Sequence, residues 1–448
     1  MKKKIKTLLI VCFIALSGTA MLKANDTLKI SLKQAIEIGL SKSPTIKIAD
    51  KQLERVDYSN KEKMAALYPN ISASGSYQRA LKKQRMFFSF PGMPANPDGI
   101  EVGQDNTFVG GLSASLPIIS PTLWATLKMN EVDLQMANET ARSSEINLIN
   151  QITKAYYTIL MMQDSYSVFE RNYKNTEAST RIIADKFKLG SVSEFEWLRA
   201  DVQLRNALTN TISAESGVEM SKLQLKTLMG LDLSTEIKLE GNLSEYEKAL
   251  YGDMLAVDTT QLTKNTDLKQ LDLRLEQMKK SLDVHKSSYL PTLAGSINYQ
   301  YMSMGNDSVA FAKYPWFPTS TASLSLSIPI FQGGAKHYKS KQLKLQMDEM
   351  NLQKVNLKKN LELQANIYVD NMKKSIDKIQ SNKKGLVQAE KAVTISRKMY
   401  EEGVATFLDL SNSELNLLQA GLSYNQSVYD FISAKADLEK LLGKTINQ

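Results

Sequence analysis

Residues Thr122–Leu189 read TLWATLKMNEVDLQMANETARSSEINLINQITKAYYTILMMQDSYSVFERNYKNTEASTRIIADKFKL, which is 68 residues with neither proline nor glycine. At about 1.5 Å of rise per residue, a continuous helix of this length spans roughly 100 Å, far more than a helix of an ordinary globular domain. A second stretch, Ala335–Glu402, is interrupted only by Gly385. The two stretches predict very long helices that need packed neighbours along their length.

Both long stretches carry apolar residues at the seven-residue spacing of a coiled coil. Ile152, Ile159 and Tyr166 form such a row in the first stretch, and Leu343 and Met350 form one in the second. Further rows run at a shifted phase, which favours helices that pack against neighbours on two sides. A plain two-stranded coiled coil is the alternative that periodicity alone leaves open.

Strand patterns lie only in two zones, residues 44–121 and 291–329, which also hold all 11 prolines. Apolar or small residues alternate there with hydroxyl and amide residues in four runs, at about residues 71–78, 108–116, 293–301 and 320–328. A period of two is typical of strands with one apolar face, and about ten residues suffice for a tilted membrane strand. Each zone therefore predicts a hairpin of two membrane-length strands.

The two halves of the chain repeat each other. Pro69 and Pro291 are 222 residues apart, whereas Pro117 and Pro329 are 212 apart, which places ten extra residues in the first hairpin loop, Leu81–Asn106. Each half is expected to run helix, strand, loop, strand, very long helix, glycine turn and medium helix. The shorter helices are predicted at Thr45–Leu67, Glu194–Met229, Thr266–Tyr289 and Ala405–Leu442. The predicted domains are a first repeat over residues 25–235, an irregular linker at 236–258 and a second repeat over 259–448.

The first 24 residues have the order of a secretory signal peptide, with basic Met1–Lys6, apolar Thr7–Leu22 and small Ala24. Its removal takes away five lysines and Cys12, so the net charge falls from +9 to +4 and no cysteine is left. An exported chain of this kind forms no disulfides. Lipid attachment at Cys12 is the less favoured alternative, because Val11 stands where a lipoprotein signal has a small residue.

Composition argues against several classes of function. The two histidines, His285 and His337, are 52 residues apart and have no acidic or thiol cluster beside them. A metal centre or a catalytic triad within one chain is therefore not expected, and we predict neither enzyme activity nor a cofactor. Lysines are frequent between Lys336 and Lys391, but interleaved acids, the small net charge and export argue against nucleic acid as a partner.

Four amphipathic strands cannot close a membrane barrel alone, because the smallest such barrels have about eight strands and an open edge in lipid leaves backbone groups unpaired. If the strands span a membrane, the chain must therefore oligomerise. Aromatic residues near the strand ends predict interface girdles: Tyr68, Phe87, Phe88, Trp124, Tyr289, Tyr314, Trp316 and Phe317. A soluble β-domain packed by these side chains is the alternative.

The order of these features, together with two junctions between strand and helix, resembles the TolC family of outer-membrane efflux proteins. The junctions are IPIFQGG at Ile328–Gly334, which contains Pro329, Gly333 and Gly334, and the weaker copy LPIISP at Leu116–Pro121, which contains Pro117. The likeness covers essentially the whole chain after the signal peptide. It implies a mixed α and β membrane protein with duplicated halves, in which three copies form a 12-stranded β-barrel in the outer membrane and an α-helical barrel in the periplasm.

The resemblance also implies a passive exit duct of a tripartite efflux or type I secretion system, for small molecules or proteins. The implied partners are two further copies in a homotrimer, outer-membrane lipid, a periplasmic adaptor (membrane fusion) protein and an inner-membrane RND or ABC transporter that supplies the energy. Two other classes stay open. A trimeric surface adhesin would carry one block of strands at the C-terminus, and a periplasmic coiled-coil scaffold or pump adaptor would need no membrane hairpins.

Two glycine turns, at Gly190 and Gly403, match the periplasmic ends of that family, where adaptors dock. Asp409 matches an aspartate ring that narrows the family's entrance, and a ring of carboxylates on one axis would attract cations. Tyr400 and Glu196 match the partners of a link between helices in the closed state. The resemblance therefore implies a gate beside the turns at Gly190 and Gly403, formed by Asp409, Tyr400 and Glu196.

The chain departs from the family at two tip positions. Ala405 stands where a linking arginine is expected, and Asn412 stands where a second aspartate is expected. We therefore expect the closed state to be held more weakly or by other contacts. The alternative is that Glu196 and Asp409 are solvated charges of the tips without a gating role.

Overall fold

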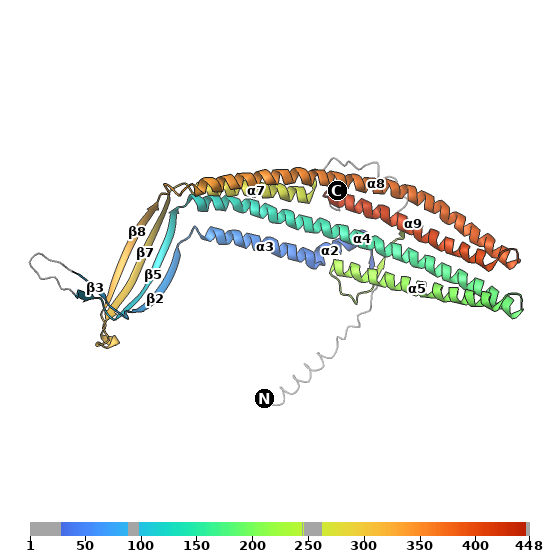
Figure 1. The fold of residues 1–448 in the computed structure, drawn as a ribbon, viewed down its shortest axis with the longest axis horizontal. Coiled ribbons are helices and arrows are strands. Elements are labelled where there is room, and N and C mark those ends of the chain that lie inside the picture. Colours follow the sequence, from blue (N-terminus) through green and yellow to red (C-terminus); the bar gives the residue numbers. More distant parts are fainter. Residues whose placement is uncertain (1–27, 88–97, 244, 246–261, 445–448) are drawn as a thin grey trace, which may run out of the picture. The chain divides into compact units, whose positions relative to one another are not determined.

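The computed structural model describes residues 28–87, 98–243, 245 and 262–444. The elements, labelled in Figure 1, are β1 (Leu28–Ile30), α2 (Leu32–Lys42), α3 (Pro44–Ala65), β2 (Asn70–Arg79), β3 (Gln84–Met86), β4 (Ile100–Val102), β5 (Asn106–Ile119), α4 (Pro121–Lys188), α5 (Glu194–Met229), β6 (Ile237–Leu239), η2 (Leu262–Lys264), α7 (Thr266–Ser287), β7 (Thr292–Gly305), η3 (Phe311–Lys313), β8 (Trp316–Ser327), α8 (Ala335–Glu401) and α9 (Phe407–Leu441). The predicted signal peptide and Phe88 lie outside the described residues. None of the described helices is both long and apolar enough to cross a membrane.

The two very long helices form as predicted, with 68 residues in α4 and 67 in α8. Pro121 opens α4 at a position where its fixed φ fits and its missing N–H costs nothing. The medium helix α5 matches its predicted bounds, because Ser193 caps its first turn and Gly230 ends it in the left-handed conformation. Local capping therefore sets these boundaries.

The described residues divide into two compact units, and each unit is discontinuous in sequence. The helical unit contains the described residues up to Ala49, Ala141–Thr266 and those from Lys358 onward, and the strand-bearing unit contains Asp50–Thr140 and Asp267–Leu357. Both halves of the duplicated chain thus contribute to each unit. Neither half has a unit of its own.

A four-stranded antiparallel sheet has the order β2-β5-β7-β8 (Figure 1). Its register aligns apolar and small side chains across all four strands, as in the row Ile71, Ala114, Ile297 and Ala322. Residues paired in register share a face, so the neighbouring rows place hydroxyl and amide side chains on the other face. One such row contains Ser72, Ser113, Asn298 and Thr321. The predicted strands, with one apolar and one polar face, are confirmed.

The two outer strands of this sheet, β2 and β8, are exposed at every residue. Within the described residues, each outer strand pairs on one side only. Two rows of backbone N–H and C=O groups are therefore available to other strands. The sheet is open in the single chain, as the count of four strands predicted.

Several short elements were not predicted from the sequence. Strands β1 and β6 form a parallel pair, and the buried Tyr156 hydroxyl lies 3.2 Å from the Ile30 carbonyl oxygen and 2.7 Å from that of Glu240. Strands β3 and β4 form a small antiparallel pair inside the long first hairpin loop. Such pairs of three residues give too short a pattern for periodicity to detect.

Two adjacent glycines of β5 give a matched test of the sheet. A Cβ built on Gly111 would lie 2.5 Å from the Tyr299 carbonyl oxygen and 2.6 Å from the Gln300 Cβ, whereas one on Gly110 would meet nothing within 4 Å. We therefore expect Gly111→Ala to destabilise the sheet by about 1–3 kcal/mol, the usual cost of an overpacked site, and Gly110→Ala to be close to neutral. The thermal unfolding midpoint in mild detergent measures both. Equal midpoints for the two variants would contradict this register.

Candidate functional site

Two short turns connect the long helices to the medium helices, α4 to α5 and α8 to α9. Gly190 and Gly403 end the long helices with φ of 71° and 77°. A Cβ on either would meet nothing within 4 Å, so the left-handed backbone and not the space selects glycine. Ser193 and Thr406 then cap the following helices through their side-chain oxygens. The sequence predicted both turns at these positions.

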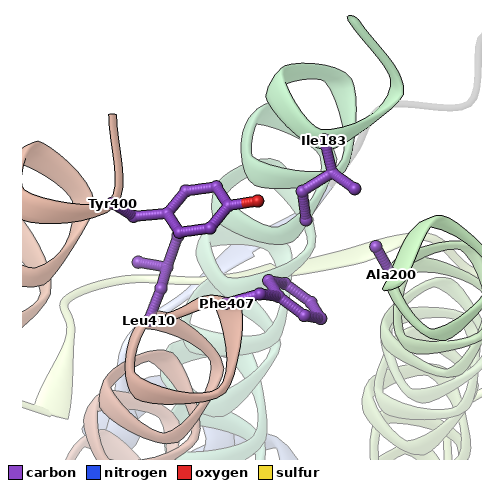
Figure 2. Packing of buried hydrophobic residues seen from close by; sticks show 5 residues of the cluster. All are labelled: Ile183, Ala200, Tyr400, Phe407 and Leu410. Atoms are coloured by element: carbon purple, nitrogen blue, oxygen red, sulfur yellow. The ribbon is translucent and has the colours of Figure 1, made fainter. Parts of the chain in front are cut away.

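All four helices meet in one apolar cluster next to these turns (Figure 2). The cluster contains Ile183 of α4, Ala200 of α5, Tyr400 of α8, and Phe407 and Leu410 of α9. Ile183, Ala200 and Leu410 are fully buried. The turns are therefore held by a shared core, and a displacement of one helix pair from the other would expose it.

Tyr400 adds polar contacts to this cluster. Its hydroxyl donates to Glu196 Oε1 at 3.3 Å, so the structure brings together the two residues that the sequence paired. Lys186 Nζ donates to the Tyr400 carbonyl oxygen at 2.8 Å and lies 4.3 Å from the centre of its ring. Burial, and then the charge of Glu196, raise the pKa of Tyr400 to about 12. The hydroxyl is therefore a protonated donor at neutral pH, and Lys186 is a cationic contact that the sequence did not indicate.

Asp409 has a local role at the start of α9. Its Oδ2 accepts from the Thr406 hydroxyl at 2.6 Å and from the Thr406 backbone N–H at 3.0 Å, which completes a capping box. These hydrogen bonds, the hydroxyl first, hold the pKa of Asp409 below its usual value. The side chain is exposed, and no contact within the described residues joins it to Tyr400 or Glu196. The structure therefore does not bring all three predicted gate residues together.

The residues predicted at the junctions divide into two groups. Pro329, Gly333 and Gly334 lie between β8 and α8, where both glycines have positive φ. Pro117 instead lies inside β5, at a shift of register between Pro117 and Ile119. This position suits a proline, because β2 no longer pairs with β5 there and a bulge needs fewer ladder hydrogen bonds.

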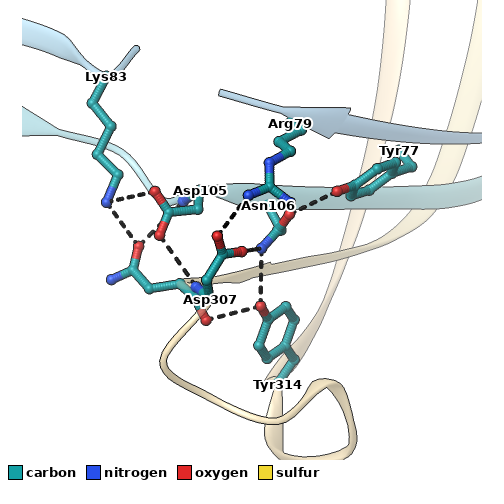
Figure 3. Close-up of polar contacts among 8 residues, drawn as sticks. Tyr77, Arg79, Lys83, Asp105, Asn106, Asp307 and Tyr314 are labelled. Atoms are coloured by element: carbon teal, nitrogen blue, oxygen red, sulfur yellow. Dashed lines mark hydrogen bonds and ion pairs between the residues drawn. The ribbon is translucent and has the colours of Figure 1, made fainter. Parts of the chain in front are cut away.

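At the loop end of the sheet, a polar network joins the two hairpins (Figure 3). Lys83 Nζ lies 3.0 Å from Asp105 Oδ1, and Arg79 Nη2 lies 2.7 Å from Asp307 Oδ2. Asn106 Nδ2 donates to Asp307 Oδ1 at 2.8 Å. The long first loop is thus held against the second loop at its base.

The described aromatic residues near the strand ends are exposed, with one exception. Tyr68, Phe87, Trp124, Tyr289, Trp316 and Phe317 are all exposed. Tyr314 is buried at 8% exposure, because its ring covers Gly305 and its hydroxyl donates to the Asn306 carbonyl oxygen at 3.0 Å. Its placement in a girdle was therefore wrong, and it closes the second loop instead.

The family profile described as "Outer membrane efflux protein" matches residues 35–231 and 260–444. The chain belongs to this family. Its two matched blocks correspond to the two halves found from the proline spacings and the repeated order of elements. The resemblance to the TolC family, drawn from the order of the features and the strand-to-helix junctions, is confirmed.

Known relatives of this efflux protein are distant in sequence but similar over most of their length. The chain is 18% identical over 338 residues to the outer membrane protein TolC of Vibrio cholerae, covering 75% of this chain and 77% of that protein. It is 20% identical over 424 residues to the alkaline protease secretion protein AprF of Pseudomonas aeruginosa, covering 94% and 86%. The crystal structure of the Campylobacter jejuni CmeC outer membrane channel superposes with a TM-score of 0.70 at 18% identity, covering 92% and 85%.

These findings establish the class of the protein. The efflux protein is an exit duct of the outer membrane, with the fold of a channel that combines an α-helical barrel with membrane strands. The adhesin and scaffold alternatives are not favoured. The family is one of ducts, and membership in it implies no catalytic role.

The capping box at Asp409 has a pH dependence that can be measured. Because the folded-state pKa of Asp409 is lowered, the cap stabilises α9 above the ordinary carboxyl pKa of 3.8 and is lost as pH falls through the lowered value. We expect amide exchange in the first turn of α9, corrected for intrinsic rates, to quicken below about pH 4. Thr406→Ala should quicken it roughly fivefold at pH 7, because the capping hydroxyl is lost, while Asp409→Ala should abolish the acid step. An acid step that persists in Asp409→Ala would contradict this role of Asp409.

Proposed function

We propose that three copies of the efflux protein close a 12-stranded barrel through the edges of β2 and β8, and that the closed barrel is the membrane part of the duct. The observation that supports this proposal is the open sheet of four strands with one apolar face. In lipid, the free backbone groups of both edges must be paired, and a β2 edge can meet a β8 edge of the next copy in a ring. Three copies of four strands give twelve.

The proposed barrel has its apolar rows toward lipid and its polar rows toward the lumen. Exposed apolar side chains such as Ile71, Ile297 and Leu324 would contact acyl chains, while serine pairs line the water-filled interior. On the polar face, Ser72 and Ser113 share a hydrogen bond of 2.8 Å, and so do Ser296 and Ser323. A neutral hydroxyl lining suits the passage of chemically varied cargo.

We infer the division of the chain from its repeats. Residues 1–24 are proposed as a signal peptide, 25–235 and 259–448 as the two repeats, and 236–258 as the linker. The profile matches at residues 35–231 and 260–444 support this division, since they fall within the two proposed repeats.

The proposed partners are a periplasmic adaptor and an inner-membrane transporter of RND or ABC type. Among the relatives, the name of AprF refers to alkaline protease secretion, and that of TtgC of Pseudomonas putida refers to a toluene efflux pump. Both kinds of system fit a duct without its own energy source. The turns at Gly190 and Gly403 are the proposed docking points for the adaptor.

The proposed gate combines the Tyr400–Glu196 hydrogen bond with a ring of Asp409 carboxylates from three copies. The hydrogen bond joins α8 to α5 and would keep the tips together in the closed duct. Asp409 is exposed beside the second turn, so its charge is available to cations in spite of the capping box.

Oligomeric state and conductance test the duct itself. Protein extracted in mild detergent from separated outer membranes should have the mass of three protomers and should form ion-conducting pores in planar bilayers. Fewer than about eight strands cannot close a membrane barrel, so at least two copies of the four-stranded sheet are needed, and the family resemblance implies three. A soluble monomer or dimer in the periplasmic fraction would overturn the proposal.

Removal of the Tyr400 hydroxyl tests the proposed link. Tyr400→Phe keeps the ring packed in the cluster but loses the hydrogen bond to Glu196, so we expect single-channel conductance to rise several-fold. Tyr173→Phe is the matched control, because Tyr173 is a half-buried tyrosine on a different helix, α4. This variant should conduct like the parent protein. Equal conductance of Tyr400→Phe and its control would remove Tyr400 from the gate.

The charge of Asp409 is tested separately from its capping role. Asp409→Ala removes the ring charge and both hydrogen bonds of the carboxylate, whereas Thr406→Ala removes only the capping hydroxyl and keeps the charge. Block by multivalent cations should weaken in Asp409→Ala and persist in Thr406→Ala, because block depends on the carboxylate charge. If both variants lose block equally, helix capping and not the charge explains the effect.

A further inference from the structure

One charged side chain lies in the apolar seam of α9. The seam contains the buried residues Phe407, Leu410, Gly421 and Val428, and Glu414 occupies the position between the first two and the last two at only 1% exposure. Asp and Glu are almost never fully buried unless they are paired, so Glu414 needs an explanation beyond packing.

The contacts of Glu414 connect three helices within the helical unit. Ser179 of α4 donates to Glu414 Oε1 at 2.7 Å, and Nη2 of Arg397 on α8 lies 3.6 Å from the same oxygen. Arg397 Nη2 also donates to Asn175 Oδ1 of α4 at 3.0 Å. The α8–α9 pair is thus tied to α4 by a cation and an anion, a few residues from the tip cluster.

This arrangement supplies a cation that the tip sequence lacks. Ala405 stands where the family resemblance implies a linking arginine, and α8 instead offers Arg397 before the turn. Its side chain is 29% exposed, while its carboxylate partner is enclosed. The pair therefore sits at the edge of the core, where a small separation of the helices would admit water.

The polar groups around Glu414 are not all satisfied by hydrogen bonds. Within the described residues, Glu414 Oε2, Arg397 Nε and Thr176 Oγ1 are buried and make no hydrogen bond of ordinary geometry, although Thr176 is close enough to Glu414 to lower the pKa of its carboxyl. Burial, as the largest effect, raises the pKa of the Glu414 carboxyl, which means that the surroundings disfavour its charge despite Ser179 and Arg397. A fully satisfied network would hold the helices firmly, whereas this one regains hydration when the helices part.

We propose that Glu414 and Arg397 form a releasable latch that ties the α8–α9 pair to α4 in the closed duct and takes over the linking role that Ala405 cannot perform. The latch rests on the proposed gated duct. Glu414 and Arg397 are positioning residues, because they hold helices together and do not contact cargo. Burial of the charged pair costs free energy of desolvation. This cost favours opening once another force begins to separate the tips.

Single-channel conductance of the reconstituted full-length protein tests the latch. Glu414→Gln and Arg397→Met each leave one member of the pair without its charged partner, so each should raise conductance at least threefold. The double variant Glu414→Leu with Arg397→Met replaces the pair by apolar side chains and should return conductance to the parent level or below. A rise of conductance in the single variants and its return in the double variant is the expected result. If the pair were merely structural, removal of both partners would not restore the conductance of the parent protein.

A second ion pair between α4 and α9 provides the matched control. Lys154 Nζ lies 2.9 Å from Asp437 Oδ2, far along both helices from the turns. Lys154→Met should leave conductance unchanged, while the mass of the assembly and its thermal midpoint are measured for every variant. If a single variant fails to assemble, Ser179→Ala removes one hydroxyl from the same cluster and should raise conductance in the same direction.

Three outcomes are distinguishable. Raised conductance in the single variants with restoration in the double variant supports the latch. Assembled single variants that conduct like the parent, or a double variant more open than either, would overturn it. A parent protein that forms no pore would instead overturn the proposed duct, and the latch with it.

Discussion

The pairing of backbone hydrogen bonds at the outer strands β2 and β8 is the constraint on which the rest of the structure depends. A sheet edge in water can be solvated, but in hydrocarbon each unpaired N–H or C=O group costs several kcal/mol. About every second residue of the ten in β2 and the twelve in β8 presents such groups at the free edge in the single chain. Closure by copies of the same chain removes this cost without new sequence, and it also explains why the apolar face is continuous across all four strands.

The helical unit uses a different balance of forces along its length. Near the middle of α4 the buried residues include the large apolar Ile152, Ile159 and Leu160, whereas Thr176, Ser179 and Thr180 form a buried polar band before the apolar tip cluster that contains Ile183. Apolar packing stabilises in proportion to buried area and is not directional, while hydroxyl contacts depend on geometry. The packing of this band therefore depends on the geometry of its hydroxyl contacts, unlike the apolar packing on either side of it.

The sequence predicted the long helices, the strands and the duplication because these features repeat over many residues. It failed for β1, β6, β3 and β4, since three residues give no period, and it misplaced Tyr314, whose burial depends on a loop closing over Gly305. Of the gate residues, the family resemblance paired Tyr400 with Glu196, but Lys186, Arg397 and Glu414 were missed. A signal for Glu414 was present: it is a lone carboxylate seven residues after Phe407 and seven before Gly421, in a row that is otherwise apolar or small up to Val428.

The discontinuity of the helical unit has a consequence for biogenesis. Its β1 strand pairs with β6 from the middle of the chain, and the buried Asn265 amide donates to the carbonyl oxygen of Leu441 near the C-terminus at 2.8 Å. A chain that emerges from a translocation channel N-terminus first thus exposes β1 and α4 long before their last partner arrives. Folding dominated by such distant contacts is slow and leaves apolar seams open to aggregation. Periplasmic chaperones that shield unfolded segments are therefore expected to bind this chain until α9 has been delivered.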